Sequence, residues 1–159
     1  MQFGELLVRE GIALVYGGGH VGLMGIVADA VLANGGIAIG VIPRALWDRE
    51  VGHRSLTKLH IVETMHERKA LMASLSDAFV ALPGGLGTLE EIFEVWTWAQ
   101  LGIHDKPVAF LDAEGFFTPL MEFLDRAVNA GFVRAQHRAM AIVDSDPVAL
   151  LRRLAQQSN

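Results

Sequence analysis

The sequence contains no cysteine. Disulfides, thiolate metal sites and a cysteine nucleophile are therefore excluded, and the absence fits a reducing compartment. Long apolar runs are also missing, because the longest, such as residues 37–42, are far too short to span a bilayer. The N-terminal residues show no basic-then-apolar signal pattern. We therefore expect a soluble, cytoplasmic protein with no membrane partner.

Positive charge is scarce as well. Thirteen Lys and Arg stand against 18 Asp and Glu, which gives a net charge of −5 and a pI near 5.6. This balance argues against nucleic acid as a partner. Apolar residues make up 52% of the chain and its mean hydropathy is +0.35, so we expect helices on both faces of a sheet, or a partner subunit, to cover much of the surface. The length of 159 residues predicts a single domain over 1–159.

The pattern along the chain is a helix followed by alternating strands and helices. The expected strands are short, continuously apolar runs, which are typical of a parallel sheet covered on both faces. The sequence therefore predicts an α/β fold: a doubly wound, Rossmann-like parallel sheet with helices on both faces. Such folds normally begin with a strand, whereas this chain begins with an expected helix at residues 3–10, so the usual first strand is expected to be lacking. The expected strands are residues 12–16, 37–42, 58–62, 78–82, 107–111 and 140–143.

A first glycine-rich loop follows the strand expected at residues 12–16. Residues 17–22 read Gly-Gly-Gly-His-Val-Gly and fit the G-x-G-x-x-G spacing between a strand and a helix. A dinucleotide site also needs an acid at the end of the next strand, but that strand ends in Pro43 and Arg44. NAD and FAD are therefore disfavoured. Two alternatives stay open: Gly18 and Gly19 lie near a phosphate or sugar, or the loop is only a tight turn against a closely packed helix.

A second glycine-rich loop spans residues 83–91, between the strand expected at residues 78–82 and a helix expected from Leu89 to about Leu101. Glycines let the backbone approach a phosphate, and the helix N-terminus attracts an anion. The loop has no Gly-Lys-Ser/Thr sequence and hence no P-loop lysine, so we expect it to hold a monophosphate. The residues of this loop with backbone or hydroxyl groups suited to phosphate are Gly84, Gly85, Gly87 and Thr88.

Two acids stand on the first turn of that expected helix. Thr88 and Glu91 have the spacing of a capping box, in which the glutamate has a structural role, and the same box recurs at Thr64 and Glu67. Helical geometry, however, places Glu91 opposite the apolar face. The residues expected on that opposite face are Glu90, Glu91, Glu94 and Thr97, together with Trp98 and Leu101. Acids beside Trp98 and Leu101 indicate a pocket or a subunit contact, so the structural and functional interpretations of Glu91 both remain open.

Arg68 is the other conspicuous charge. It lies at the centre of an apolar helical stripe formed by Met65, Leu71, Met72 and Leu75. An arginine there extends to solvent, pairs with a buried acid, or faces a ligand. We find no His, Asp or Glu spacing that predicts a metal site.

Taken together, three stretches resemble the LONELY GUY (LOG) family of cytokinin riboside 5′-monophosphate phosphoribohydrolases, which are often mislabelled lysine decarboxylases. The stretches are residues 16–25 with Tyr-Gly-Gly-Gly and Gly-Leu-Met-Gly, residues 65–69 with Met-His-Glu-Arg-Lys, and residues 83–91 with Pro-Gly-Gly-Leu-Gly-Thr-Leu-Glu-Glu. The resemblance runs from about Phe3 to the C-terminal helix. It implies hydrolysis of the N-glycosidic bond of a cytokinin riboside 5′-monophosphate or AMP, which gives free base and ribose 5-phosphate without a cofactor.

The resemblance also implies roles for individual residues. Arg68 and Glu91 would be the catalytic pair, and the loop at Gly85, Leu86, Gly87 and Thr88 would hold the phosphate. Residues that would contact substrate or support the pocket are Gly18, Gly19, Glu50, Lys69, Glu90 and Thr97. The family forms homodimers or larger homo-oligomers with the active site near the interface. The alternative is a non-catalytic nucleotide or cofactor carrier of the same fold, similar to molybdenum-cofactor carrier proteins.

Overall fold

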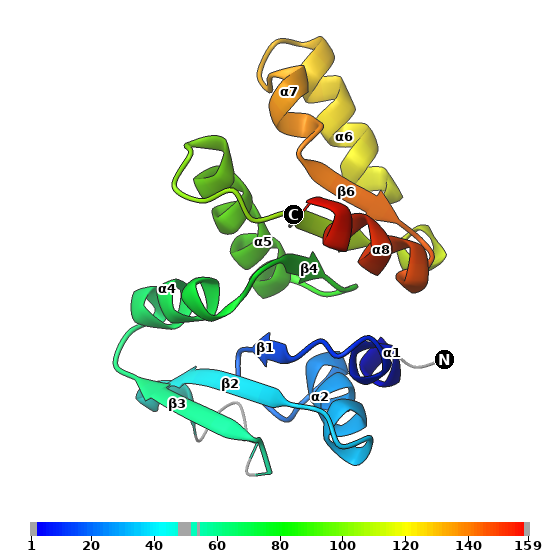
Figure 1. Cartoon of the computed structure of the whole chain (residues 1–159). Coiled ribbons are helices and arrows are strands. Elements are labelled where there is room, and N and C mark those ends of the chain that lie inside the picture. Colours follow the sequence, from blue (N-terminus) through cyan, green and yellow to red (C-terminus); the bar gives the residue numbers. More distant parts are fainter. Residues whose placement is uncertain (1–2, 48–51, 54, 158–159) are drawn as a thin grey trace. The chain divides into compact units, whose positions relative to one another are not determined.

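The computed structural model describes residues 3–47, 52–53 and 55–157 (Figure 1). The chain divides into two compact units, of which one ends at Ser76 and the other begins at Asp77. Each unit contains a three-stranded sheet in which all pairings are parallel.

The first unit contains a sheet with the order β1-β2-β3. Its register places Tyr16 beside Gly40 and Val41 beside His60. The strands are β1 (Leu14–Tyr16), β2 (Ala38–Pro43) and β3 (Lys58–Val62). The helices are α1 (Phe3–Arg9), α2 (Leu23–Ala33), α3 (Arg44–Trp47) and α4 (Met65–Leu75). Every residue of β2 except Ile39 is buried, as expected for the central strand of a covered sheet.

Local chemistry explains how several elements of this unit begin and end. α2 stops at a cap formed by Asn34, and Gly35 then takes a positive φ of 77°, a conformation that glycine adopts at little cost. α4 begins after Thr64, whose side chain accepts a hydrogen bond from the backbone N–H of Glu67. The Glu67 carboxylate in turn accepts from the N–H of Glu63 at 2.8 Å. The capping box predicted at Thr64 and Glu67 is thus present, with its return bond made one residue earlier than usual.

The second unit contains a sheet with the order β4-β5-β6. Its strands are β4 (Phe79–Ala81), β5 (Val108–Leu111) and β6 (Ala141–Asp144). The helices are α5 (Leu86–Gln100), the 3₁₀ helix η1 (Ala113–Gly115), α6 (Thr118–Asn129), α7 (Ala135–Arg138) and α8 (Pro147–Gln157). As predicted, α8 opens with an aspartate cap, because the Asp146 side chain accepts from the N–H of Val148 at 2.9 Å.

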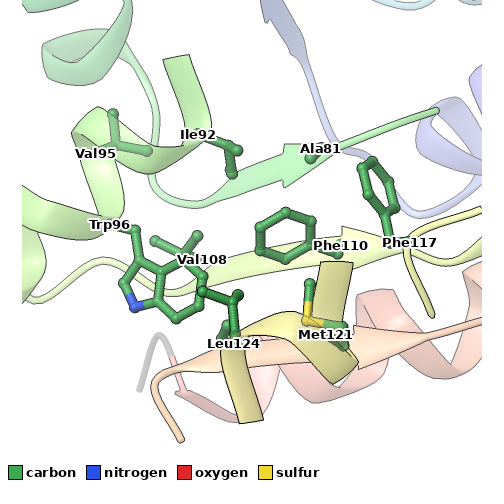
Figure 2. Packing of buried hydrophobic residues seen from close by; sticks show 10 residues of the cluster. Ala81, Ile92, Val95, Trp96, Val108, Phe110, Phe117, Met121 and Leu124 are labelled. Atoms are coloured by element: carbon green, nitrogen blue, oxygen red, sulfur yellow. The ribbon is translucent and has the colours of Figure 1, made fainter. Parts of the chain in front are cut away.

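The second unit is built around a cluster of aromatic and aliphatic side chains (Figure 2). Phe110 of β5 is fully buried, and its ring meets those of Trp96 and Phe117 edge-on, at centroid distances of 5.8 and 5.2 Å. α5 contributes Ile92, Val95 and Trp96, and α6 contributes Met121 and Leu124. This packing fixes the orientation of α5, the helix that follows the second glycine-rich loop.

The predicted parallel α/β architecture, with helices on both sides of the sheets, is confirmed, as are the six strands within a residue or two. The first described element is the helix α1, as expected. One boundary prediction is wrong in a way that affects the site: α5 begins at Leu86 rather than at Leu89. The single nucleotide-binding domain over residues 1–159 remains a prediction.

Candidate functional site

The first glycine-rich loop follows β1, and its own backbone groups bond to distant parts of the first unit. The carbonyl oxygen of Gly17 accepts a hydrogen bond from Arg68 Nη2 at 2.6 Å, and that of Gly18 accepts from the N–H of His53 at 2.9 Å. Gly19 forms an isolated antiparallel bridge with Gly52. The loop is therefore held by contacts from residues far away in the sequence.

Glycine is required at two positions of this loop for different reasons. A Cβ on Gly17 would overlap the guanidinium of Arg68. Gly18 has a φ of 75°, in the left-handed region that favours glycine, and its Cα lies so close to Gly40 that a Cβ on Gly40 would come within 2.8 Å of it. The loop is thus tightly packed, and whether Gly18 and Gly19 lie near a phosphate or sugar stays a prediction.

Arg68 is the only buried residue among those described in α4, with 7% of its surface exposed. Besides its bond to Gly17, it donates from Nε to the carbonyl oxygen of Val41 at 3.0 Å, and Nη1 lies 3.7 Å from Met65 Sδ. The guanidinium therefore joins the loop that follows β1 to the middle of β2. The sequence did not predict hydrogen bonds from this arginine to main-chain carbonyls, because periodicity cannot show which backbone groups a side chain reaches.

The stripe around Arg68 also differs from the prediction. Met65 and Leu75 are exposed, at 41% and 38%, and Leu71 and Met72 are half-buried. The arginine is thus more deeply buried than the apolar side chains that flank it. Burying a cationic group is costly unless it is paired and hydrogen-bonded, and the two carbonyl acceptors supply part of that stabilisation.

The second glycine-rich loop joins β4 to α5, and Gly85 is the N-cap of the helix. The first intrahelical bond of α5 runs from Leu89 N–H to the Gly85 carbonyl. The N–H groups of Leu86, Gly87 and Thr88 therefore precede the intrahelical bonding pattern and are oriented toward the helix N-terminus. A Cβ on Gly85 or Gly87 would have open space around it. A 15-residue helix that begins with three such amides, and whose first glycines leave the backbone accessible, is suited to binding an anion.

The earlier start of α5 changes the interpretation of Glu91. The alternative that Thr88 and Glu91 form a capping box does not hold, because Gly85 is the N-cap and Thr88 lies inside the helix. The purely structural explanation of Glu91 that rested on this box is therefore removed. Glu91 is half-buried and Glu90 is exposed.

The apolar face predicted for α5 is confirmed, because Ile92, Val95, Trp96 and Ala99 are buried. Trp98 was expected beside the acids, but it packs against the core cluster of the second unit. Leu101 is 66% exposed, in agreement with its predicted place away from the core. Thr97 is exposed, and its hydroxyl donates to the carbonyl oxygen of Phe93 at 2.7 Å, an attachment one helical turn back.

The predicted site residues are distributed over both units. Gly18, Gly19, Arg68 and a half-buried Lys69 belong to the first unit, and the remaining described ones belong to the second. The structure brings the first glycine-rich loop and Arg68 together in the first unit. In the second unit, the second glycine-rich loop leads directly into α5, which carries Glu90 and Glu91. Glu50 lies outside the described residues. The assignment of Arg68 and Glu91 as a catalytic pair remains a prediction.

The sequence did not predict one cluster of polar side chains. His20, Asp29 and His53 place one donor atom each within 4.8 Å of the others. They come from the glycine-rich loop, from α2 and from the segment after α3, so no local spacing connects them.

The sequence also gave no indication of the environment of Tyr16. Its buried hydroxyl has no hydrogen-bond partner among the described residues. Burial, together with the charge of Asp29, raises the pKa of Tyr16. Among the described helices, none is long and apolar enough to cross a membrane.

Comparisons with known proteins connect this geometry to a family. A sequence family described as "Possible lysine decarboxylase" matches residues 24–154. The chain is 49% identical over 158 residues to the rice (Oryza sativa subsp. japonica) protein named "Probable cytokinin riboside 5′-monophosphate phosphoribohydrolase LOGL2", and the match covers 99% of this chain and 65% of the rice protein. It is 48% identical over 154 residues to the Arabidopsis thaliana cytokinin riboside 5′-monophosphate phosphoribohydrolase LOG1, with 97% and 72% covered.

Among solved structures, the molybdenum cofactor binding protein of the phototrophic bacterium Rippkaea orientalis shares the fold. Its TM-score is 0.69 at 22% identity, and the match covers 98% of this chain and 83% of that one. This likeness concerns the fold alone. Membership of a family is shown by two findings: the family model matches residues 24–154 of this chain, and the two plant relatives match nearly all of it at about half identity. This chain is therefore a member of the LOG family, the family whose sequence description reads possible lysine decarboxylase.

Proposed function

We propose that this protein hydrolyses the N-glycosidic bond of a cytokinin riboside 5′-monophosphate or of AMP. Water is consumed, the base leaves with a proton, and the other product is ribose 5-phosphate. The proposal rests chiefly on 48–49% identity to proteins named for this reaction. The chain spans 65% of the length of the rice relative, so the activity is proposed for this chain from the part that is shared.

The N-terminus of α5 supports a phosphorylated substrate. The amides of Leu86, Gly87 and Thr88 precede the intrahelical bonds, and the helix dipole favours negative charge at this end. Gly85 and Gly87 leave space for an anion to approach the backbone. The loop has no lysine, which fits a monophosphate better than a di- or triphosphate.

We propose that Glu91 and Arg68 carry the chemistry. N-glycosidic cleavage passes through a state with oxocarbenium character, as in the hydrolysis of glycosides. A carboxylate at Glu91 would stabilise that positive charge or activate the attacking water, and Arg68 would position the nucleotide and assist departure of the base. Lys69, Glu90 and Thr97 would contact substrate or support the pocket, and Glu50 is assigned the same role from the resemblance.

A cytoplasmic homodimer or larger homo-oligomer, with the active site near the interface, is part of this proposal. It is supported by exposed apolar side chains that follow α5, because Leu101 and Ile103 are 66% and 64% exposed. Isolated apolar residues are common on surfaces, so the resemblance to the LOG family remains the main support for this assembly.

The experiment is to incubate the purified protein with AMP and with N⁶-isopentenyladenosine 5′-monophosphate and to measure free base and ribose 5-phosphate. The two products should appear in equal amounts, and the matching nucleosides without phosphate should react far more slowly. Tight nucleotide binding without release of base would contradict hydrolysis and support the carrier alternative. Release of CO₂ from lysine would support decarboxylation instead.

A further inference from the structure

Asp29 lies between two histidines in the first unit. Its Oδ1 is 2.9 Å from His53 Nε2, and its Oδ2 is 3.2 Å from His20 Nε2. The two imidazole rings lie with their centroids 4.4 Å apart and are tilted by 60°. His53 is buried, with 3% of its side chain exposed, whereas Asp29 is 55% exposed. One carboxylate therefore links α2 to both the glycine-rich loop and the segment that contains His53.

A second hydrogen bond fixes which nitrogen of His53 carries the proton. The backbone N–H of Ser55 donates to His53 Nδ1 at 3.3 Å, so Nδ1 is the acceptor in neutral His53. Nε2 then holds the proton and donates it to Asp29. A carboxylate that accepts such bonds is favoured in its charged form. In agreement, the hydrogen bond from His53 is the largest cause of a lowered pKa of Asp29.

The backbone of the same histidine holds the glycine-rich loop. The N–H of His53 donates to the carbonyl oxygen of Gly18 at 2.9 Å, and the neighbouring Gly52 pairs with Gly19. Asp29 thus fixes the side chain of His53, and His53 fixes the loop through its main chain. Arg68 holds the adjacent Gly17 carbonyl from α4. The loop is attached through groups from two further segments of the first unit.

We infer that Asp29 and His53 are positioning residues that hold the Gly17–Gly19 loop in the conformation in which it meets the nucleotide. The inference rests on the proposed function for the ligand of the loop. The hydrogen bonds that hold the loop do not depend on that function. The expected consequence is specific: loss of the Asp29 carboxylate loosens a binding loop and so weakens substrate binding more than it slows bond cleavage.

A divalent cation is the competing explanation of this cluster, because three donor atoms lie within 4.8 Å of one another. A metal bound at His53 Nε2 would need the lone pair of that nitrogen, and the ring proton would move to Nδ1. There it would face the Ser55 N–H that now donates to Nδ1. The observed bond therefore favours the hydrogen-bonded arrangement over a metal site.

The test compares Asp29→Ala, Asp29→Asn and the control Asp125→Ala in the full chain. Asp125 is matched to Asp29 because it is 59% exposed and pairs with one basic side chain, Arg138, at 2.8 Å in the second unit. Asp29→Ala should raise KM for the nucleotide about tenfold, the equivalent of losing one hydrogen bond to a charged group, with a smaller change in kcat. Asp29→Asn keeps an oxygen acceptor and should recover much of the loss, and the control should behave as wild type.

Comparing the change in KM with the change in kcat distinguishes a positioning role of Asp29 from a simple loss of folded protein. A purely structural role would lower the active fraction, and hence the apparent kcat, at an unchanged KM; that result would overturn the inference. Saturable binding of Zn²⁺ or Co²⁺ by calorimetry, abolished by Asp29→Ala and not by Asp125→Ala, would also overturn it, because Asp29 would then be a metal ligand.

A further readout does not depend on catalysis. Hydrogen exchange should show the His53 amide protected in the wild type and exposed in Asp29→Ala, while amides of the second unit stay unchanged. If the wild type releases no base, the proposed function fails, yet this exchange result still decides whether Asp29 holds the loop. Unchanged protection of His53 in Asp29→Ala would contradict the inference.

Discussion

The guanidinium of Arg68 donates from Nη2 to the carbonyl oxygen of Gly17 at 2.6 Å, across 51 residues of sequence. Its Nε bonds to Val41 at the same time. An arginine implied as catalytic by the family resemblance is therefore also a structural link between the loop after β1 and strand β2. Its substitution is expected to affect stability as well as turnover, so activity measured on an Arg68 variant alone cannot assign its role.

Replacing Arg68 by lysine should destabilise the fold. A single ammonium cannot reproduce the planar fork that reaches the carbonyls of Gly17 and Val41 together. Loss of one charged hydrogen bond at a buried acceptor predicts a decrease of about 2–3 kcal/mol in the free energy of unfolding, measured by urea denaturation. The control Arg126→Lys, an exposed position on α6, should leave it unchanged. A wild-type denaturation midpoint for Arg68→Lys would contradict the assigned bonds.

Replacing Glu91 by glutamine tests catalysis with little effect on the fold. Glu91 is half-buried and lies inside α5 rather than at its N-cap, which is Gly85. We expect kcat for base release to fall by about 10²–10⁴-fold, the usual range for loss of a general acid–base group, at an unchanged Tm. Glu122→Gln, at an exposed position on α6, is the matched control. Equal turnover by both variants would remove Glu91 from the catalytic pair.

Replacing Gly87 by alanine tests the phosphate loop. The new Cβ meets no atom within 4 Å beyond its chain neighbours and the backbone of its own helix, and Gly87 lies in the first turn of α5. The free energy of unfolding should therefore hold or rise by up to about 1 kcal/mol. The methyl group would occupy the space through which a phosphate approaches. KM for AMP should therefore rise, while the inhibition constant of adenosine, which has no phosphate, should not change. Parallel changes for AMP and adenosine would place the phosphate elsewhere.

Tyr16 offers a prediction about pH. It is the only tyrosine in the sequence, so the absorbance of tyrosinate reports on this residue alone. Burial first, and the charge of Asp29 second, raise its pKa above the ordinary 10.0. Above pH 10.0 the unfolded chain loses the Tyr16 proton while the folded chain keeps it, so the folded state loses stability as the pH rises.

The variant Tyr16→Phe checks this assignment. It should abolish that contribution to the loss of stability at high pH. Near neutral pH it should not destabilise the protein, because the hydroxyl is buried and has no hydrogen-bond partner among the described residues. Tyrosinate absorbance that appears at the ordinary pH in the folded protein would show that Tyr16 is solvated.

The helix boundaries show how far local sequence information reaches. The Thr64 and Asp146 caps were predicted correctly because a cap depends on residues two or three positions apart. The start of α5 was placed three residues late, because Gly85, Leu86 and Gly87 read as a loop. Glycines weaken a helix on average, yet the packing of Ile92, Val95 and Trp96 against the second-unit core stabilises the whole of α5.

The sequence by itself determined the order of strands and helices, the buried face of α5, the two glycine-rich loops and the family. Each of these depends on the identity and spacing of residues within a short stretch of sequence. Only the tertiary structure decided what Arg68 bonds to and how His20, Asp29 and His53 come together. These contacts join residues that are 9, 24 or 51 positions apart. Arg68 bonds to main-chain carbonyls, and Asp29 bonds to two histidine side chains. No periodicity in the sequence shows which of these groups the folded chain brings within hydrogen-bonding distance.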